Sequence, residues 1–137
     1  MYNWHMRVTL LFIAALVAGI TMFLPGCHKN PASSHIPQVV NVKDNFHLQM
    51  SDVKNHDTLL VYYWPMEGMS ANIDQSASIK GGQVAIVIED NSQLQIYQTD
   101  MKQNGSFTTM SGTAGYWRIR VALTDFSGMI DFRAQRR

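Results

Sequence analysis

Cysteine is nearly absent from this sequence, which has a single one, Cys27, among 137 residues. One thiol cannot form an internal disulfide, so no covalent bridge stabilises the fold. Net charge is also almost absent, because 11 basic and 10 acidic side chains nearly cancel. A chain with this balance has no electrostatic reason to bind nucleic acid, and we expect no such partner.

Sequence signatures of catalysis are missing as well. No serine has the flanking glycines of an esterase, and no glycine-rich loop leads into a predicted helix. No pair of histidines has the spacing of a zinc motif. We therefore expect a protein that is not an enzyme and that carries no cofactor or metal.

Two sets of residues nevertheless keep a metal site open as an alternative. Five soft ligands that suit Cu(I) occur in the middle of the chain: His47, Met50, His56, Met66 and Met69. Three acidic residues offer oxygen ligands to Ca²⁺: Glu89, Asp90 and Asp100. We favour ordinary roles for both sets, because methionine commonly fills cores and aspartate commonly forms turns.

One long apolar run is present, and it lies near the N-terminus. Residues 8–24 carry no charge and follow a basic residue, Arg7. The length of this run lies between that of a signal-peptide core and that of a bilayer-spanning helix. The run ends in the tetrapeptide Leu24-Pro25-Gly26-Cys27, which contains the only cysteine of the chain.

This tetrapeptide resembles the lipobox of bacterial lipoproteins, in which an aliphatic residue and a small residue precede an invariant cysteine. Leu24 and Gly26 match that pattern, whereas Pro25 replaces the usual small or hydroxylated residue. The resemblance implies cleavage between Gly26 and Cys27 and attachment of diacylglyceryl and palmitate-type acyl chains at Cys27. Several acyl chains anchor a protein firmly, since each buried CH₂ contributes about 0.8 kcal/mol. A retained transmembrane helix is the alternative.

The resemblance also implies a location and a domain organisation. We expect a lipid-anchored protein on the extracytoplasmic side of a bacterial envelope. His28 is not the aspartate that retains lipoproteins in the inner membrane, so the outer membrane is favoured in a Gram-negative host. The predicted parts are a signal peptide (1–26), a lipidated cysteine with a proline-containing tether (27–42) and a folded domain (43–137).

The folded domain shows the two-residue period of β-strands and no helical period. Eight segments are predicted as strands, separated by turn residues, with a turn at 125–128 before the last: 46–50, 58–64, 71–79, 83–88, 94–99, 107–110, 116–123 and 130–132. We interpret 58–64 as a central strand and 71–79 as an edge strand, and we expect Asn104-Gly105 to join 94–99 and 107–110 in a hairpin. The predicted fold is an all-β, antiparallel sandwich of about seven or eight strands, with a barrel as the alternative.

The half of the chain from Gly82 onward is similar to small extracellular immunoglobulin-like and carboxypeptidase-regulatory-like modules. Three pieces carry the similarity: VAIVIEDNSQLQIYQT, NGSF and AGYWRIRVALTDFSGMIDF. This similarity implies an architecture and no activity, because many unrelated functions use such folds.

Exposed aromatic and basic residues give the only candidate binding face. Strand alternation places Tyr116, Arg118 and Arg120 on the side away from the core, and it exposes either Tyr63 or its two neighbours. We expect a non-enzymatic interaction module that contacts a protein or complex of the envelope. The alternatives are a module that binds carbohydrate or another small ligand, and a copper-handling protein.

Overall fold

The computed structural model describes residues 35–137, which form six β-strands and no helix. The strands are β1 (Gln38–Val42), β2 (Asn45–Met66), β3 (Ala71–Glu89), β4 (Gln95–Thr99), β5 (Gly105–Thr108) and β6 (Gly115–Arg136). The described residues contain no helix with the length and hydropathy needed to span a bilayer. The predicted signal peptide and the predicted lipidation site at Cys27 lie outside the described residues.

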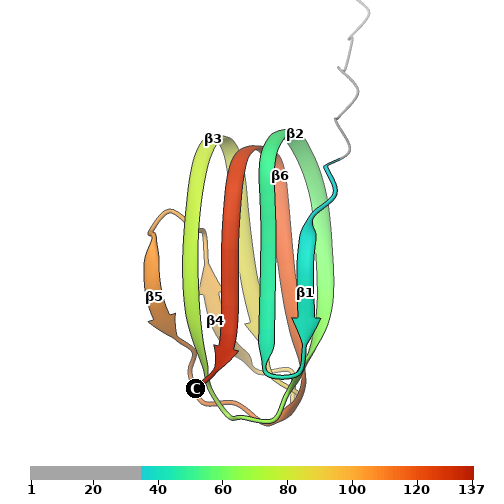
Figure 1. Cartoon of the computed structure of the whole chain (residues 1–137), viewed down its shortest axis with the longest axis vertical. Coiled ribbons are helices and arrows are strands. Elements are labelled where there is room, and N and C mark those ends of the chain that lie inside the picture. The colour runs from blue at the N-terminus through green and yellow to red at the C-terminus, as the bar shows by residue number, and fades with distance from the viewer. Residues whose placement is uncertain (1–34) are drawn as a thin grey trace, which may run out of the picture. The chain divides into compact units, whose positions relative to one another are not determined.

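Three long strands, β2, β6 and β3, build the domain. Every pair of neighbouring strands is antiparallel, in the order β1-β2-β6-β3-β4, and β5 lies beside β3. The three long strands arch over together at one end, so that the sheet folds back on itself (Figure 1). The predicted all-β antiparallel sandwich is thereby confirmed.

Each long strand contributes one part to each layer of this sandwich. We call first layer the part made of β1, β5 and residues 45–50, 71–79 and 128–136. We call second layer the part made of β4 and residues 58–66, 83–89 and 115–123. The arched end is formed by the residues that connect these parts within the three long strands.

Left-handed backbone conformations produce the arch. Asn55 in β2, Gly82 in β3 and Asp125 in β6 have φ angles of 43°, 70° and 46°. Such angles interrupt the regular pleat, and the strand pairing shifts its register at the same level. The turns predicted at Gly81-Gly82 and at 125–128 are therefore bends within continuous strands, and the predicted strands 46–50 and 58–64 likewise join in β2. These three unions reduce the eight predicted strands to five, and β1 makes six.

The core is filled by the residues that strand alternation assigns to it. The expected inward residues Phe46, Leu48 and Met50 are all buried. Trp64 and Trp117 are fully buried and meet edge to face, with ring centroids 5.6 Å apart. Each indole N–H also finds a backbone carbonyl, at Val42 for Trp64 and at Thr113 for Trp117, so neither ring leaves a polar atom unpaired.

Two predicted strand positions are exchanged in the structure. Residues 58–64, predicted to be central, pair only with β6 and form the margin of the second layer. Residues 71–79, predicted at an edge, pair with β6, and 72–75 also pair with β5 on the other side; Ala71 and Ile73 there are completely buried. An apolar run reports a tendency to form a strand, but the number of neighbouring strands depends on pairings far apart in the chain.

The hairpin predicted around Asn104-Gly105 is wrong, because β4 and β5 do not pair with each other. β4 pairs with β3 in the second layer, and β5 pairs with β3 in the first layer. The intervening loop therefore crosses from one layer to the other, and the Asn104 side chain accepts a hydrogen bond from the Ala77 N–H. The predicted tether extends to Val42, whereas the structure has Gln38–Val42 paired with β2 as strand β1.

Candidate functional site

The four residues proposed from the sequence as a binding face lie on the outer side of the second layer. Tyr63 of β2 pairs across the strands with Arg118 of β6, and Tyr116 and Arg120 share the orientation of Arg118. We call this set, Tyr63, Tyr116, Arg118 and Arg120, the tyrosine–arginine face. The two tyrosines are 62% and 65% exposed, so both rings are available to a partner.

Glu89 holds the two arginines in place, a role that the sequence alone does not reveal. Its side chain is only 11% exposed, and its Oε2 accepts hydrogen bonds from Nε and Nη2 of Arg118. Its Oε1 accepts a hydrogen bond from Nη2 of Arg120 at 2.8 Å. One carboxylate thus fixes two guanidinium groups, and the cluster keeps one excess positive charge.

The sequence indicates which way Glu89 faces, but not which residues it contacts. Alternation along β3 turns Glu89 to the same outer side as Val87 and Ala85, but the partner strand is β6, almost thirty residues further on. Sequence proximity instead groups Glu89 with nearby acidic residues, as a candidate calcium ligand.

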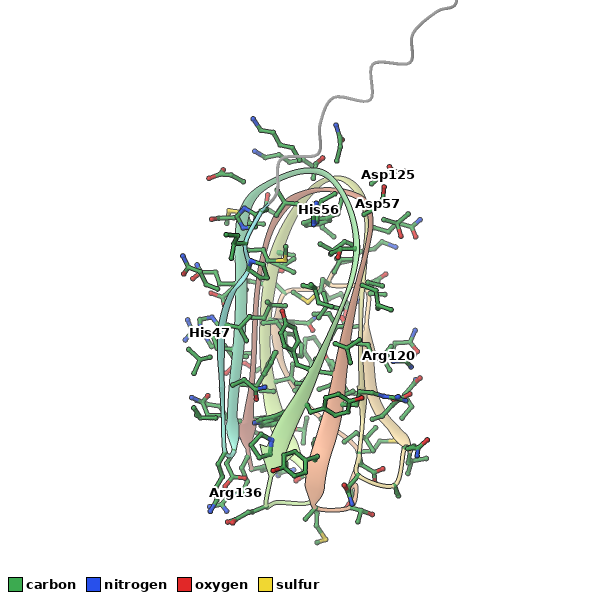
Figure 2. All side chains as sticks on the ribbon, turned by 90° about the vertical axis from the view of Figure 1, so that its right-hand side faces the viewer. His47, His56, Asp57, Arg120, Asp125 and Arg136 are labelled. Carbon is green, nitrogen blue, oxygen red and sulfur yellow. The ribbon has the colours of Figure 1, made fainter. Side chains whose placement is uncertain are left out.

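Apolar side chains continue the tyrosine–arginine face along β2. Leu59 and Val61 are 62% and 43% exposed and lie in line with Tyr63 at the margin of the second layer. Isolated exposed apolar residues are normal, but three consecutive outward positions on one strand make a stripe. Arg120, beside Val61, points outward from the second layer (Figure 2).

The five copper candidates are spread over the molecule. Met50 and Met66 are buried in the core, and Met69 is exposed in the connection between β2 and β3. Figure 2 shows His56 at the arched end and His47 lower on the side, where its Nε2 lies 3.0 Å from Oδ1 of Asp131. Residues 35–137 contain no group of three or more His, Cys, Asp or Glu placed to hold a metal.

The acidic calcium candidates have separate structural roles. Asp90 is buried, and burial alone would raise its pKa. Hydrogen bonds to its carboxylate outweigh burial and lower the pKa to about 2, the largest contributions coming from the Thr113 N–H, the Ser92 hydroxyl and the Leu94 N–H. Asp90 therefore ties the β3–β4 turn to the segment before β6. Asp100 is paired with Lys102 at 2.9 Å on the surface.

Two hollows flank the loop between β4 and β5. One, of about 620 Å³, is lined by the rings of Tyr97 and Phe107 and by the glutamines Gln75, Gln98 and Gln103, among others. The other, of about 510 Å³, has small or aliphatic residues such as Ala85 and Ala122 in its lining. Gln75 is buried, and its amide donates to Thr99 and Gln103 and accepts from the Tyr97 hydroxyl, so it has no free N–H to offer a ligand in the first hollow.

Comparisons with known proteins give no family. No family model matches the chain, and no curated protein matches it. One similar solved structure is described as "CBM4 structure and function", with 9% identity, a TM-score of 0.35, and coverage of 79% of this chain and 81% of that chain. Another is procruciferin, an 11S globulin from Brassica napus, with 10% identity and a TM-score of 0.36. Its match covers 77% of this chain and 28% of that chain. Similarities this distant carry no inference about function.

Proposed function

We propose that this chain is a lipid-anchored envelope protein that acts as a non-enzymatic interaction module. In this proposal Cys27 carries the lipid, and the domain presents its tyrosine–arginine face to a protein or complex of the same envelope. The outer membrane is the proposed location in a Gram-negative host.

The observation that carries the proposal is the composition of the tyrosine–arginine face. Tyrosine and arginine are enriched at protein interfaces, because both combine a large contact surface with polar atoms that find partners. Here two exposed tyrosines lie beside two arginines that Glu89 already orients. A preformed arrangement loses less conformational entropy when it binds, since its side chains are ordered beforehand.

The excess positive charge of this face indicates the chemistry of the partner. Arg118 and Arg120 share one carboxylate, so an additional carboxylate from outside would complete their pairing. We therefore propose that the contacted surface of the partner is acidic and contains apolar side chains that cover Tyr63 and Tyr116.

Site-specific photocrosslinking in cells tests this proposal. A photoreactive phenylalanine derivative at Tyr116 replaces one exposed ring by another, and the same derivative at Met129 is the control. Met129 is 52% exposed and faces outward from the first layer. We expect the Tyr116 probe to capture one reproducible envelope protein that the Met129 probe does not capture. Equal capture by both probes, or no capture, would reject the proposed interface.

Binding of a carbohydrate or another small ligand is a second candidate, favoured by the hollow next to Tyr97. Its volume of about 620 Å³ and its mixture of two aromatic rings and glutamine side chains suit a sugar ring. A rise in the melting temperature of the protein with a defined glycan would support this candidate, provided that Phe107→Ala removes the rise. No such shift across a glycan panel would reject it.

A further inference from the structure

The second-layer part of β2 has one free side. Residues 58–66 pair with β6 on one side only. Near their end, the carbonyl of Tyr63 accepts a hydrogen bond from Nδ2 of Asn41, and that of Pro65 accepts one from the Asp44 N–H. These bonds identify 63 and 65 as positions whose backbone points away from β6.

Strand geometry extends this assignment to Leu59 and Val61. In an antiparallel pair, the backbone groups of alternate residues point to opposite sides of the strand. Leu59 and Val61 therefore direct their N–H and C=O groups away from β6. Within residues 35–137, no group of another residue bonds to these four atoms. Free N–H and C=O groups at a sheet edge bind an extended strand, which pairs with them through its own backbone.

This free edge has few of the features that normally prevent edge pairing. Natural edges are usually short, or carry proline, lysine or other charged residues. Residues 58–66 contain no charged residue, and their one proline, Pro65, lies at the end where Asp44 already bonds its carbonyl. Leu59 and Val61 precede it and are exposed. The other marginal strands are short, with five residues in β1, five in β4 and four in β5.

We infer that the occupant is β2 of a second copy of this chain, paired antiparallel across a two-fold axis beside Leu60. In this register Leu59 lies opposite Val61 of the second copy, and the free groups of both residues form four backbone hydrogen bonds. Leu60 lies opposite its own counterpart. The segment 58–64 meets itself without bringing any charges together, so it is complementary to itself.

Pairing of this kind joins the second layers of two copies into one continuous sheet. A two-fold axis between antiparallel strands is perpendicular to the sheet, so both tyrosine–arginine faces lie on the same side. An edge contact of this length is smaller than a standard interface of about 1,600 Å², so association is weak in dilute solution. Concentration of the chain on a membrane favours the pairing. The inference rests on the edge and on the proposed membrane anchor, and not on the proposed envelope partner.

Disulfide trapping of the full-length chain in its native membrane tests the inference. Residues that face each other without mutual hydrogen bonds have Cα atoms about 4.5 Å apart, within the range of a disulfide. We expect Leu60→Cys to give a covalent homodimer on mild oxidation. Gln98→Cys, on β4 at the other margin of the second layer, is the control and should stay monomeric, although Gln98 is more exposed than Leu60. The unsubstituted chain controls for Cys27.

A lysine placed on the edge separates specific pairing from random collision. Val61→Lys adds a charge next to the axis, and we expect it to reduce the Leu60→Cys dimer at least tenfold. Val40→Lys is the control, because Val40 lies on β1 and is 45% exposed, close to the 43% of Val61. This control should leave the dimer unchanged.

Three results would overturn the inference. The first is an equal yield of dimer from Leu60→Cys and Gln98→Cys. The second is a Leu60→Cys adduct with a different protein, which would make that protein the occupant. The third is the absence of any covalent dimer from Leu60→Cys on oxidation in the membrane. None of these results depends on the partner captured by the Tyr116 probe, so the two proposals fail separately.

Discussion

Among single residues, Asp90 shows most clearly how one side chain holds several segments together. Its carboxylate accepts the N–H groups of Ser92 and Leu94 from its own turn and that of Thr113 from the approach to β6. Gly112 packs against it, since a Cβ on that glycine would lie 2.8 Å from Cβ of Asp90. These bonds favour the charged form, which is why the pKa is lowered in spite of burial.

The lowered pKa of Asp90 predicts a loss of stability in acid. The folded-state pKa is about 2 and the ordinary value is 3.8, so the folded state favours the deprotonated carboxylate. This contribution, about 2 kcal/mol, is fully present above the ordinary pKa and is lost as the pH falls from about 5 to below 2. Urea unfolding between pH 2 and pH 6 measures it.

The variant Asp90→Asn removes the titrating group, so its free energy of unfolding should change less over this pH range than that of the unsubstituted protein. Asp52→Asn is a control with the same chemical change at an exposed position. An equal pH dependence in the unsubstituted protein and in Asp90→Asn would contradict the assignment.

Residue orientation could be predicted from the sequence along residues 116–121 of β6, where apolar and polar residues alternate. Trp117, Ile119 and Val121 are buried, and Tyr116 and Arg120 point outward. The role of Glu89 could not be predicted, because it depends on the pairing of β3 with β6. Alternation predicts which face of the sheet a side chain lies on, but it does not predict which strand lies next to it.

At the scale of elements, the bends of the long strands determine the architecture. A strand of 22 residues cannot remain in one small layer, and β2 and β6 both have this length. Gly82, Asn55 and Asp125 are residue types that commonly form turns, and the sequence correctly marks Gly82 and Asp125 as irregular but not Asn55. Composition does not distinguish a turn between two strands from a bend within one strand, because both need residues that adopt a left-handed backbone conformation. The predicted strands are therefore too short and too many.

The geometry of the arch predicts very different losses of stability when either of two adjacent glycines is replaced by alanine. Gly82 has a φ of 70°, and a Cβ there would lie 2.3 Å from the carbonyl oxygens of Thr124 and Asp125. Gly82→Ala should therefore destabilise the domain by about 2 to 4 kcal/mol, through backbone strain and forced separation of β3 from β6. A Cβ on Gly81 would meet nothing nearer than 3.9 Å, at Cβ of Ser127.

The matched variant Gly81→Ala should consequently change stability by less than about 1 kcal/mol. Chemical denaturation of both variants measures the difference. Equal stabilities of the two variants would contradict the account of the arch, because only Gly82 has the positive φ and the close carbonyl contacts.

For the whole molecule, the outer side of the second layer is the surface that carries both proposed contact regions. The tyrosine–arginine face and the exposed stripe of Leu59 and Val61 adjoin each other there. An all-β sandwich could be predicted from strand periodicity, because each layer has one buried side. The identity of the edges could not, since Thr58 to Trp64 has the composition of a central strand but borders its layer.

The central claim is that a lipid anchor at Cys27 brings the tyrosine–arginine face to an envelope partner. Crosslinking in cells, followed by mass spectrometry, tests it on three full-length forms: the unsubstituted chain, Cys27→Ser, and the double variant Tyr63→Ser with Tyr116→Ser. Both tyrosines are largely exposed, so the double variant should fold normally. We predict one reproducible neighbour of the unsubstituted chain, lost in Cys27→Ser and reduced at least tenfold in the double variant. The same neighbours at the same yield in all three forms would contradict the account.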